Sequence, residues 1–247
     1  MNFNKKTARA AGLLYLTIII AGIFAEFVVR SSLIVVGDAT ATANNIMASE
    51  GLFRAGIAGD LIMIMCDVAL ALVFYVLLKP VSNALALLAA FFRLAQAATL
   101  GINLLNLFLA LELLSGAEYL TLVGADQLQA QAMLFLDAHS TGYAIGLVFF
   151  GFSIMVLGYL IFKSGYLPRI LGVLLVLASF GYLIDSFARV LMPSYDNYEA
   201  VFTLVVFAPA FIAELSLCLW LLVKGVDVQQ RDNRIPLSTT QAEGIAT

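Results

Sequence analysis

The chain contains apolar runs long enough to cross a lipid bilayer, and these runs restrict its fold more than any other feature. A helix needs about 20 apolar residues to cross the hydrocarbon core of a bilayer. The runs around residues 13–24 and 170–184 extend to that length once their flanking residues are included. Overall, 62% of the residues are hydrophobic and 12% are charged, whereas soluble domains are about half apolar and a quarter charged. The sequence therefore predicts an integral membrane protein.

The apolar runs and the residues that interrupt them predict an all-α, polytopic bundle of six transmembrane helices. Pro80 separates the second run from the third, Pro168 separates the fourth from the fifth, and Pro193 follows the fifth. Proline interrupts helices because it lacks an amide N–H and clashes with the preceding turn. The bundle would occupy residues 1–225, followed by a disordered cytoplasmic tail over 226–247. The expected spans are 8–30, 54–78, 84–113, 134–162, 168–190 and 200–223.

The basic residues predict the orientation, because Lys and Arg concentrate on the cytoplasmic side of membrane proteins. Nine of the 13 basic residues fall on one side of the predicted bundle: Lys5, Lys6, Arg9, Lys79, Lys163, Arg169, Lys224, Arg231 and Arg234. The loops on the other side, 31–53, 114–133 and 191–199, carry acidic residues and have bases only at the edges of the spans. We therefore expect both termini in the cytoplasm.

Two charged residues at membrane depth are expected to meet. Asp67 lies 13 residues before Pro80, and Arg93 lies 13 residues after it. At about 1.5 Å of rise per helical residue, both lie roughly 20 Å from the turn. We predict an ion pair between them, which either ties the two helices together or belongs to a functional site.

Glu214 is a second buried carboxylate without an evident cation. It lies ten residues before Lys224, so its depth is about 15 Å by the same rise. Together with Asp67 and Arg93, it leaves one unbalanced negative charge near the middle of the membrane. Glu214 is therefore either protonated and hydrogen-bonded to a neighbouring helix, or part of a proton or cation site.

Further polar residues lie nearer the outer face. Asp60 and Asp67 share a helix face because they are two turns apart. Asp185 and Arg189 are four residues apart and are predicted to pair on one helix. Asn103 belongs to a polar stripe that must point into the bundle, because lipid cannot satisfy its hydrogen bonds. The predicted ligand or ion pathway consists of Glu26, Asp60, Asp67, Arg93, Asn103, His139, Asp185 and Glu214.

His139 is the one histidine of the chain, and it gives little support to a metal site. Asp137 lies two residues away, roughly on the opposite side of the helix. We therefore expect no bound metal and no cofactor, and a pH-sensitive hydrogen bond is the preferred role of His139. The sequence contains no metalloprotease, serine hydrolase, P-loop or dinucleotide-binding motif. It also has no basic patch suited to nucleic acid, and no catalytic residue can be assigned.

Several blocks of the sequence resemble one known family. They include TARAAGLLYLTIIIAGIFAEF, GLFRAGIAGDLIMIMCDVALALVFYVLLKPV, LALLAAFFRLAQAATLGINLLNL, FLDAHSTGYAIGLVFFG and GYLPRILGVLL. The family is the bacterial multi-pass membrane family catalogued as domain of unknown function 4386, and the resemblance covers about residues 7–225. It implies a helical bundle of six or a similar number of spans in the bacterial cytoplasmic membrane. It implies no activity.

Three function classes stay open from the sequence. The preferred one binds or transports a small polar solute, a cation or proton, or a lipid head group through an outward-facing polar site. The second is a scaffold or accessory subunit, in which the charges only fix how the helices pack. The third is a membrane-embedded hydrolase or transferase that uses His139 and Asp185. The lipid bilayer is the expected partner in each case, and oligomerisation is left open.

Overall fold

The computed structural model describes residues 5–226, apart from the side chains at positions 121, 196, 199, 203, 205 and 207. Every regular element within that range is helical. Five of the helical segments are long and apolar enough to cross a membrane. The expectation of an all-α membrane bundle is therefore confirmed. The tail predicted over 226–247 lies outside the described residues, except for Val226.

Six long helical segments make up the bundle, and short helices connect some of them. The first segment is continuous through three elements, α1 (Lys5–Ile23), the π-helix η1 (Phe24–Arg30) and α2 (Ser31–Leu33). The others are α4 (Glu50–Leu78), α5 (Asn83–Leu113), α6 (Ala125–Ser164), α7 (Arg169–Leu191) and α8 (Glu199–Val223), with α3 (Ala39–Ala48), η2 (Glu118–Leu122) and η3 (Tyr195–Asn197) between them.

The count of six spans is not settled by these helices. The five segments that meet the length and hydropathy of a span are Lys5–Leu33, α4, α5, α6 and α7. The corresponding apolar stretch of α8, Ala208–Val223, is shorter. The sixth span and the side on which the termini lie therefore stay predictions.

Breaker residues and caps set the ends of the helices. The Ser82 hydroxyl accepts a hydrogen bond of 3.4 Å from the Leu85 N–H, which caps the start of α5. Gly165 ends α6 with a φ of 73°, a left-handed conformation that glycine adopts without strain. α6 begins at Ala125, earlier than the predicted span near residue 134. Hydropathy detects only the part of a helix that lies in lipid, so it missed this extension, whose Gln129 accepts a hydrogen bond from Thr40 of α3.

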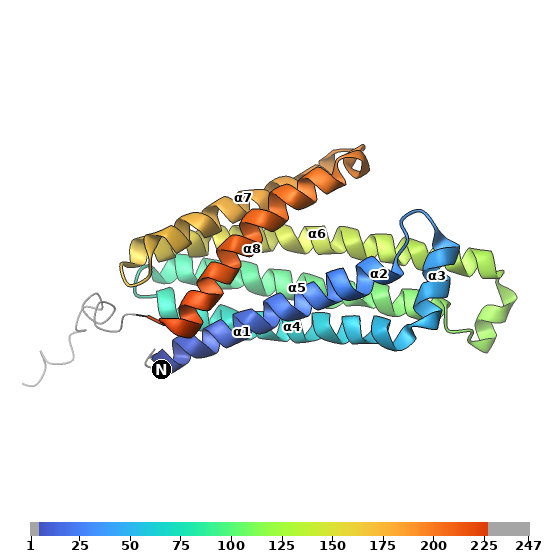
Figure 1. The fold of residues 1–247 in the computed structure, drawn as a ribbon, viewed down its shortest axis with the longest axis horizontal. Helices are drawn as coiled ribbons and strands as arrows, with labels where there is room; N and C mark the ends of the chain where they lie inside the picture. The colour runs from blue at the N-terminus through green and yellow to red at the C-terminus, as the bar shows by residue number, and fades with distance from the viewer. Residues whose placement is uncertain (1–4, 227–247) are drawn as a thin grey trace, which may run out of the picture.

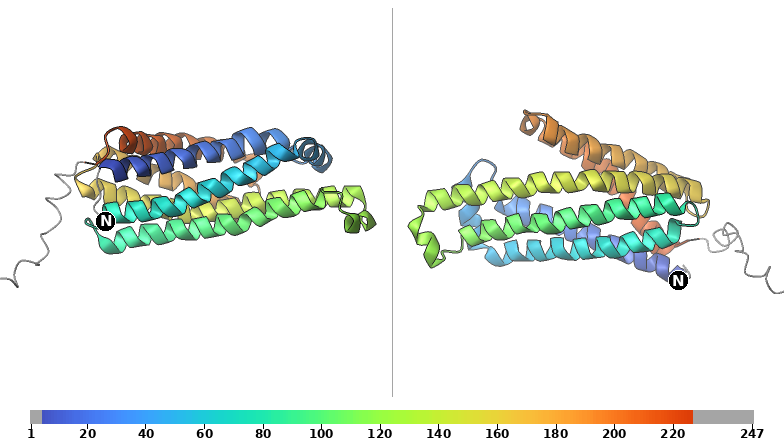
Figure 2. Two further views of the ribbon diagram at one scale, coloured as in Figure 1. Left: turned by 90° about the horizontal axis from the view of Figure 1, so that it is seen from below. Right: turned by 180° about the vertical axis from the view of Figure 1, so that it is seen from behind.

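The six long segments form a closed ring (Figure 1). Contacts join α1 to α4, α4 to α5, α5 to α6, α6 to α7, α7 to α8, and α8 back to α1. α1 begins and α8 ends at the same end of the bundle, whereas α7 leans away from α6 toward the other end (Figure 2). Side chains that point inward from any of the six segments can therefore meet along one central axis.

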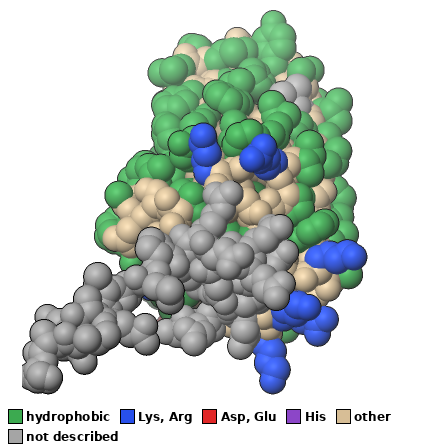
Figure 3. Space-filling model, turned by 90° about the vertical axis from the view of Figure 1, so that its left-hand side faces the viewer, with side chains coloured by type: hydrophobic (Ala, Val, Ile, Leu, Met, Phe, Trp, Pro, Cys, Tyr) green, Lys and Arg blue, Asp and Glu red, His purple; other side chains and the backbone are tan. Residues whose placement is uncertain are grey.

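The two ends of the bundle differ in charge, and its sides are apolar. Exposed side chains on the sides include Met65, Ile102 and Leu177, as expected for helices that face lipid. Blue Lys and Arg side chains lie on the end at which α1 begins (Figure 3). We call this the basic end; its exposed cations are Lys5, Lys6, Arg9, Lys79, Lys163, Arg169 and Lys224. The exposed acids Asp38, Glu50, Glu112, Glu118 and Asp126 belong to elements at the opposite, acidic end.

Glycines allow the close contact between α6 and α7. A Cβ atom on Gly158 would lie 2.7 Å from the Gly172 carbonyl oxygen, and one on Gly172 would lie 2.5 Å from the Gly158 carbonyl oxygen. The two backbones thus touch without side chains between them, as small residues permit in membrane helices. Farther along α6, a Cβ on Gly142 would clash with Asn103, so this glycine leaves room for a polar side chain.

Candidate functional site

The centre of the bundle holds an ion pair between α4 and α5. The Nη2 and Nε atoms of Arg93 lie 2.5 Å and 2.8 Å from Oδ1 of Asp67. The Gln96 amide donates a hydrogen bond of 3.2 Å to the other carboxylate oxygen of Asp67. Arg93 and Asp67 are both 2% exposed. The structure thus places in contact the two residues that the distances from Pro80 put at equal depth.

Glu214 of α8 is held by two tyrosines from the helices on either side of it. The Tyr182 hydroxyl of α7 donates a 2.7 Å hydrogen bond to Oε1, and the Tyr15 hydroxyl of α1 donates a 3.2 Å hydrogen bond to Oε2. Glu214 and Tyr15 are buried. Phenolic hydroxyls are neutral donors, so they satisfy the carboxyl oxygens without supplying a positive charge.

Arg93 joins the ion pair to the Glu214 group. Its guanidinium lies 5.6 Å from the ring centroid of Tyr15 and 5.2 Å from that of Phe150 in α6, within the range of cation–π attraction. The charges of Arg93 and Asp67 also act on Glu214. We call this set of residues the central network; its members are Tyr15, Asp67, Arg93, Gln96, Phe150, Tyr182 and Glu214. Each of the six long segments contributes at least one of them.

A second charged group lies nearer the acidic end. Nη1 and Nη2 of Arg30 lie 2.5 Å and 3.4 Å from the two carboxylate oxygens of Asp60, and its Nε lies 2.8 Å from Glu26. Arg30 and Asp60 are buried, whereas the Glu26 side chain is 54% exposed. Glu26 and Arg30 both belong to the π-helix η1, a distortion that often occurs at functional sites. Glu26, Arg30 and Asp60 form the outer cluster.

Tyr143 of α6 lies between the outer cluster and the central network. It is within electrostatic reach of Asp60 and Arg30, and also of Asp67. Along α4, Asp60 and Asp67 are separated by two turns, or about 10 Å, and the buried side chains of Met63 and Ile64 lie between them. The phenol of Tyr143 is therefore a polar group that interacts with both carboxylates.

The predicted pathway residues Asn103 and His139 meet through the backbone. The Asn103 amide donates a 2.8 Å hydrogen bond to the His139 carbonyl oxygen, and its own oxygen accepts one from Asn106. The His139 ring is buried, with its centroid 6.1 Å from that of Tyr143. Among the described residues, no group of three or more His, Cys, Asp or Glu side chains could hold a metal ion.

Asp185 and Arg189 meet at a third residue, Tyr195 of η3. The Tyr195 hydroxyl donates a 2.6 Å hydrogen bond to Asp185 and accepts one of 3.5 Å from Arg189. Arg189 also donates to the Ser140 hydroxyl of α6 at 2.7 Å. Burial and the hydrogen bond to Asp185 raise the pKa of Tyr195 to about 12. The direct pairing of Asp185 with Arg189 stays a prediction, since the phenol contacts both side chains.

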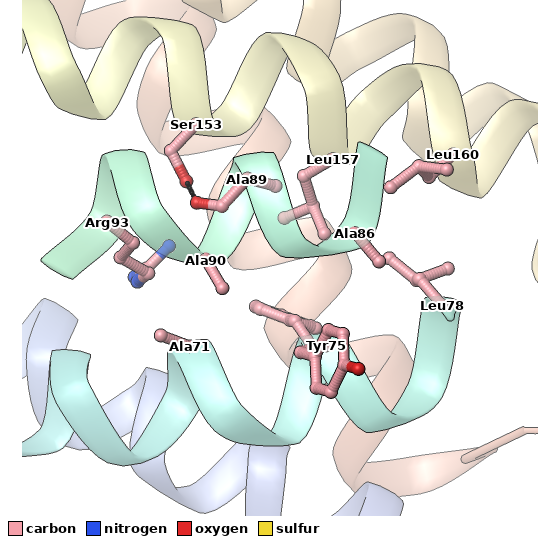
Figure 4. A pocket seen from close by; sticks show the side chains of 11 residues that line it. Ala71, Tyr75, Leu78, Ala86, Ala89, Ala90, Arg93, Ser153, Leu157 and Leu160 are labelled. Carbon is pink, nitrogen blue, oxygen red and sulfur yellow. Dashed lines mark hydrogen bonds between the residues drawn. The ribbon is translucent and has the colours of Figure 1, made fainter. Parts of the chain in front are cut away.

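The space beside Arg93 is small. A cavity between α4, α5 and α6 has a volume of about 10 Å³ and is lined mainly by alanine and leucine side chains (Figure 4). Arg93 points from α5 toward α4 at one end of this space, and Ser153 of α6 lies above it. This volume matches one water molecule and is too small for an organic solute.

The members of the central network and the outer cluster that sequence reasoning did not identify include Tyr15, Arg30, Phe150 and Tyr182. The tyrosines could have been found from their depth below the basic end. Tyr15 lies ten residues after Lys5 and Glu214 lies ten residues before Lys224, so the two side chains are at about the same depth. Tyr182 lies 13 residues after Arg169, matching the distance of Arg93 from Pro80. For Arg30, the signal is its spacing of four residues from Glu26. Its contact with Asp60 depends on how α1 packs against α4, which no local pattern records.

Comparison with known protein families identifies the family of this chain. A model of the family described as "Domain of unknown function (DUF4386)" matches residues 10–225. An uncharacterized protein of Archaeoglobus fulgidus is 30% identical over 169 residues, which are 68% of this chain and 83% of that protein. No solved structure matches the chain.

Proposed function

The chain belongs to the family described as "Domain of unknown function (DUF4386)", and we propose that this membrane protein binds and transfers protons through its central network. Glu214 is the group that takes up and releases the proton. The observation that carries the proposal is the setting of Glu214, a buried carboxyl held by hydroxyls from two helices beside the Asp67–Arg93 pair.

The balance of charge supports a positively charged ligand. With all three groups ionised, Asp67, Arg93 and Glu214 carry one net negative charge at membrane depth. An isolated charge in a medium of low dielectric constant is costly, and a bound proton or cation removes that cost. The neutral hydroxyls of Tyr15 and Tyr182 let Glu214 exist in both protonation states, because each hydroxyl can donate or accept.

The size of the cavity favours a proton over the larger ligands. A space of about 10 Å³ beside Arg93 admits no sugar, amino acid or lipid head group, whereas a proton needs only a chain of hydrogen-bonding groups. The outer cluster and Tyr143 supply such groups toward the acidic end, where Glu26 is exposed. We propose that protons enter there, so that the site opens outward.

We further propose six spans, with both termini in the cytoplasm of a cell whose cytoplasmic membrane holds the protein. The basic end would then face the cytoplasm, in agreement with the usual placement of Lys and Arg. The resemblance to a bacterial family extends this proposal to a bacterial membrane.

Proton flux into proteoliposomes tests the proposal. A pH-sensitive dye inside the vesicles reports the flux after a potassium diffusion potential is imposed. We expect flux with the unmodified protein and none above protein-free vesicles with Glu214→Gln, which keeps the shape but cannot ionise. Glu112→Gln is the matched control, because Glu112 is exposed at the end of α5, away from the central network, and accepts a hydrogen bond from Tyr119. Equal fluxes in the Glu214→Gln variant and the unmodified protein would falsify the proposal.

A scaffold is the second candidate, and the closed ion pairs favour it. Arg30 and Arg93 each contact a carboxylate on a neighbouring helix, at 2.5 Å, so the charges suffice to fix the packing of α1, α4 and α5. A scaffold would show no proton flux even in the unmodified protein. It would also tolerate replacement of both members of the Asp67–Arg93 pair together.

A further inference from the structure

One nitrogen of the buried Arg93 guanidinium has no hydrogen-bond partner in the described part of the chain. Nε and Nη2 bond Asp67, but Nη1 is buried and unpaired. A buried donor without a partner costs about 1–3 kcal/mol, and more where the donor is charged. A hydrogen-bond acceptor near Nη1 would therefore stabilise the buried guanidinium.

The cavity of about 10 Å³ beside Arg93 can hold one water molecule, and Ser153 in its lining can accept a hydrogen bond from that water. Arg93 and Ser153 both line it. The Ser153 hydroxyl donates a 2.8 Å hydrogen bond to the Ala89 carbonyl oxygen, so its lone pairs are free to accept. A buried water needs about one probe volume and two or more polar partners. Arg93 as donor and Ser153 as acceptor meet that requirement.

A larger hollow lies at the basic end of the bundle. It has a volume of about 610 Å³, and its lining includes Pro80, Lys163 and Tyr166. The Tyr166 hydroxyl donates a 2.7 Å hydrogen bond to the Leu77 carbonyl oxygen, which holds the α6–α7 turn against the last turn of α4. Leu160 lines both the hollow and the cavity, and its side chain is fully buried.

We propose that Arg93 and Ser153 bind one water molecule, and that Leu160 closes a route from this water to the hollow at the basic end. The route is the second entrance of the site, opposite the outer cluster. It rests on the proposed proton transfer, because a network that passes protons needs access from both ends. Movement of Leu160 admits water from the hollow, and protons then pass along this water to the Asp67 carboxylate, because Arg93 is already protonated and can only donate.

Thiol labelling in lipid nanodiscs tests the route without depending on proton flux. In a chain carrying Cys66→Ala and Cys218→Ala, Ser153→Cys places a thiol at the cavity with little change of size. We expect Ag⁺, a thiol reagent close to water in size, to react with it slowly. Leu160→Ala should raise the labelling rate about ten-fold or more, because it removes the side chain that fills the route.

Ala178→Cys is the matched control, since Ala178 is fully buried in α7 and does not line either space. Its labelling rate should not change with Leu160→Ala. A rise at both positions, or at neither, overturns the route. If Leu160→Ala does not fold, Leu160→Val gives the same comparison with a smaller expected rise.

A structure at a resolution that shows ordered water tests the other half of the proposal. We expect density within hydrogen-bonding distance of both Arg93 Nη1 and Ser153 Oγ, and a dry cavity overturns the water site. Leu160-dependent labelling without any proton flux in the unmodified protein would refute the proposed function alone. Flux without Leu160-dependent labelling would refute this route alone.

Discussion

Tyr15 in the first long helix donates a hydrogen bond to Glu214 in the last, with 3.2 Å between the oxygens and a separation of 199 positions along the chain. This contact lies where α8 returns to α1 and closes the ring of helices. Tyr182 completes the group from α7 at 2.7 Å. The same three side chains thus join the ends of the chain and form the proposed proton site, so their stability and their function can be measured together.

Removal of either tyrosine hydroxyl should destabilise the bundle. We expect Tyr182→Phe to cost about 1–3 kcal/mol and Tyr15→Phe somewhat less, because its hydrogen bond is longer. Reversible unfolding in detergent measures the loss. Combining each change with Glu214→Leu gives a double-mutant cycle. If each Tyr→Phe change lowers the free energy of unfolding as much in the Glu214→Leu background as in the unmodified protein, the hydrogen bonds to Glu214 do not contribute to stability.

Breaking the central ion pair should cost more than removing it. Arg93→Met leaves the Asp67 carboxylate buried without its cation, so we expect a loss of about 3–5 kcal/mol. The double change Asp67→Leu with Arg93→Met removes both charges and should recover most of that loss. The test compares the free energies of unfolding of the unmodified protein, the Arg93→Met variant and the double variant. A double variant as unstable as the single one would show that the pair does not act as a unit.

The contact between α6 and α7 should not tolerate a methyl group. Gly172→Ala brings a Cβ within 2.5 Å of the Gly158 carbonyl oxygen, so the helices must separate, at a cost of about 1–3 kcal/mol or more. Gly101→Ala in α5 is the control, because a Cβ there meets open space. That change should be neutral or stabilise by up to about 1 kcal/mol. Equal effects of the two alanines on thermal unfolding would contradict the close contact.

Reporter fusions should place both termini on the same side of the membrane. Green fluorescent protein becomes fluorescent only in the bacterial cytoplasm, because it does not fold correctly after export through the general secretion route. Alkaline phosphatase, in contrast, is active only outside the cytoplasm. We expect fluorescence from fusions at either terminus and phosphatase activity from an insertion near residue 117, in the turn after α5. A fluorescent N-terminal fusion with a dark C-terminal one would indicate an odd number of spans, and α8 would then not cross.

The sequence was sufficient for the helical class, the family and most of the turns. Each of these depends on information that is local in the chain. Runs of apolar residues mark segments that lipid must surround, because an unpaired backbone group in hydrocarbon is costly. Pro80 also fixed a hairpin, and a helix rises by a constant amount per residue, so the equal depth of Asp67 and Arg93 followed from counting. Their contact at 2.5 Å is the result of that regularity.

Only the tertiary structure decided which helices surround each charge. Depth says how far a residue lies from a turn but not which way its side chain points around the ring. The pairing of Arg30 with Asp60 requires α1 to pack against α4, and the Glu214 group requires α8 to return between α7 and α1. Those neighbours are selected by packing between segments far apart in sequence, such as the contact of Gly12 with Leu222. The apolar pattern of one helix carries no record of its partners, because lipid and protein interiors are equally apolar.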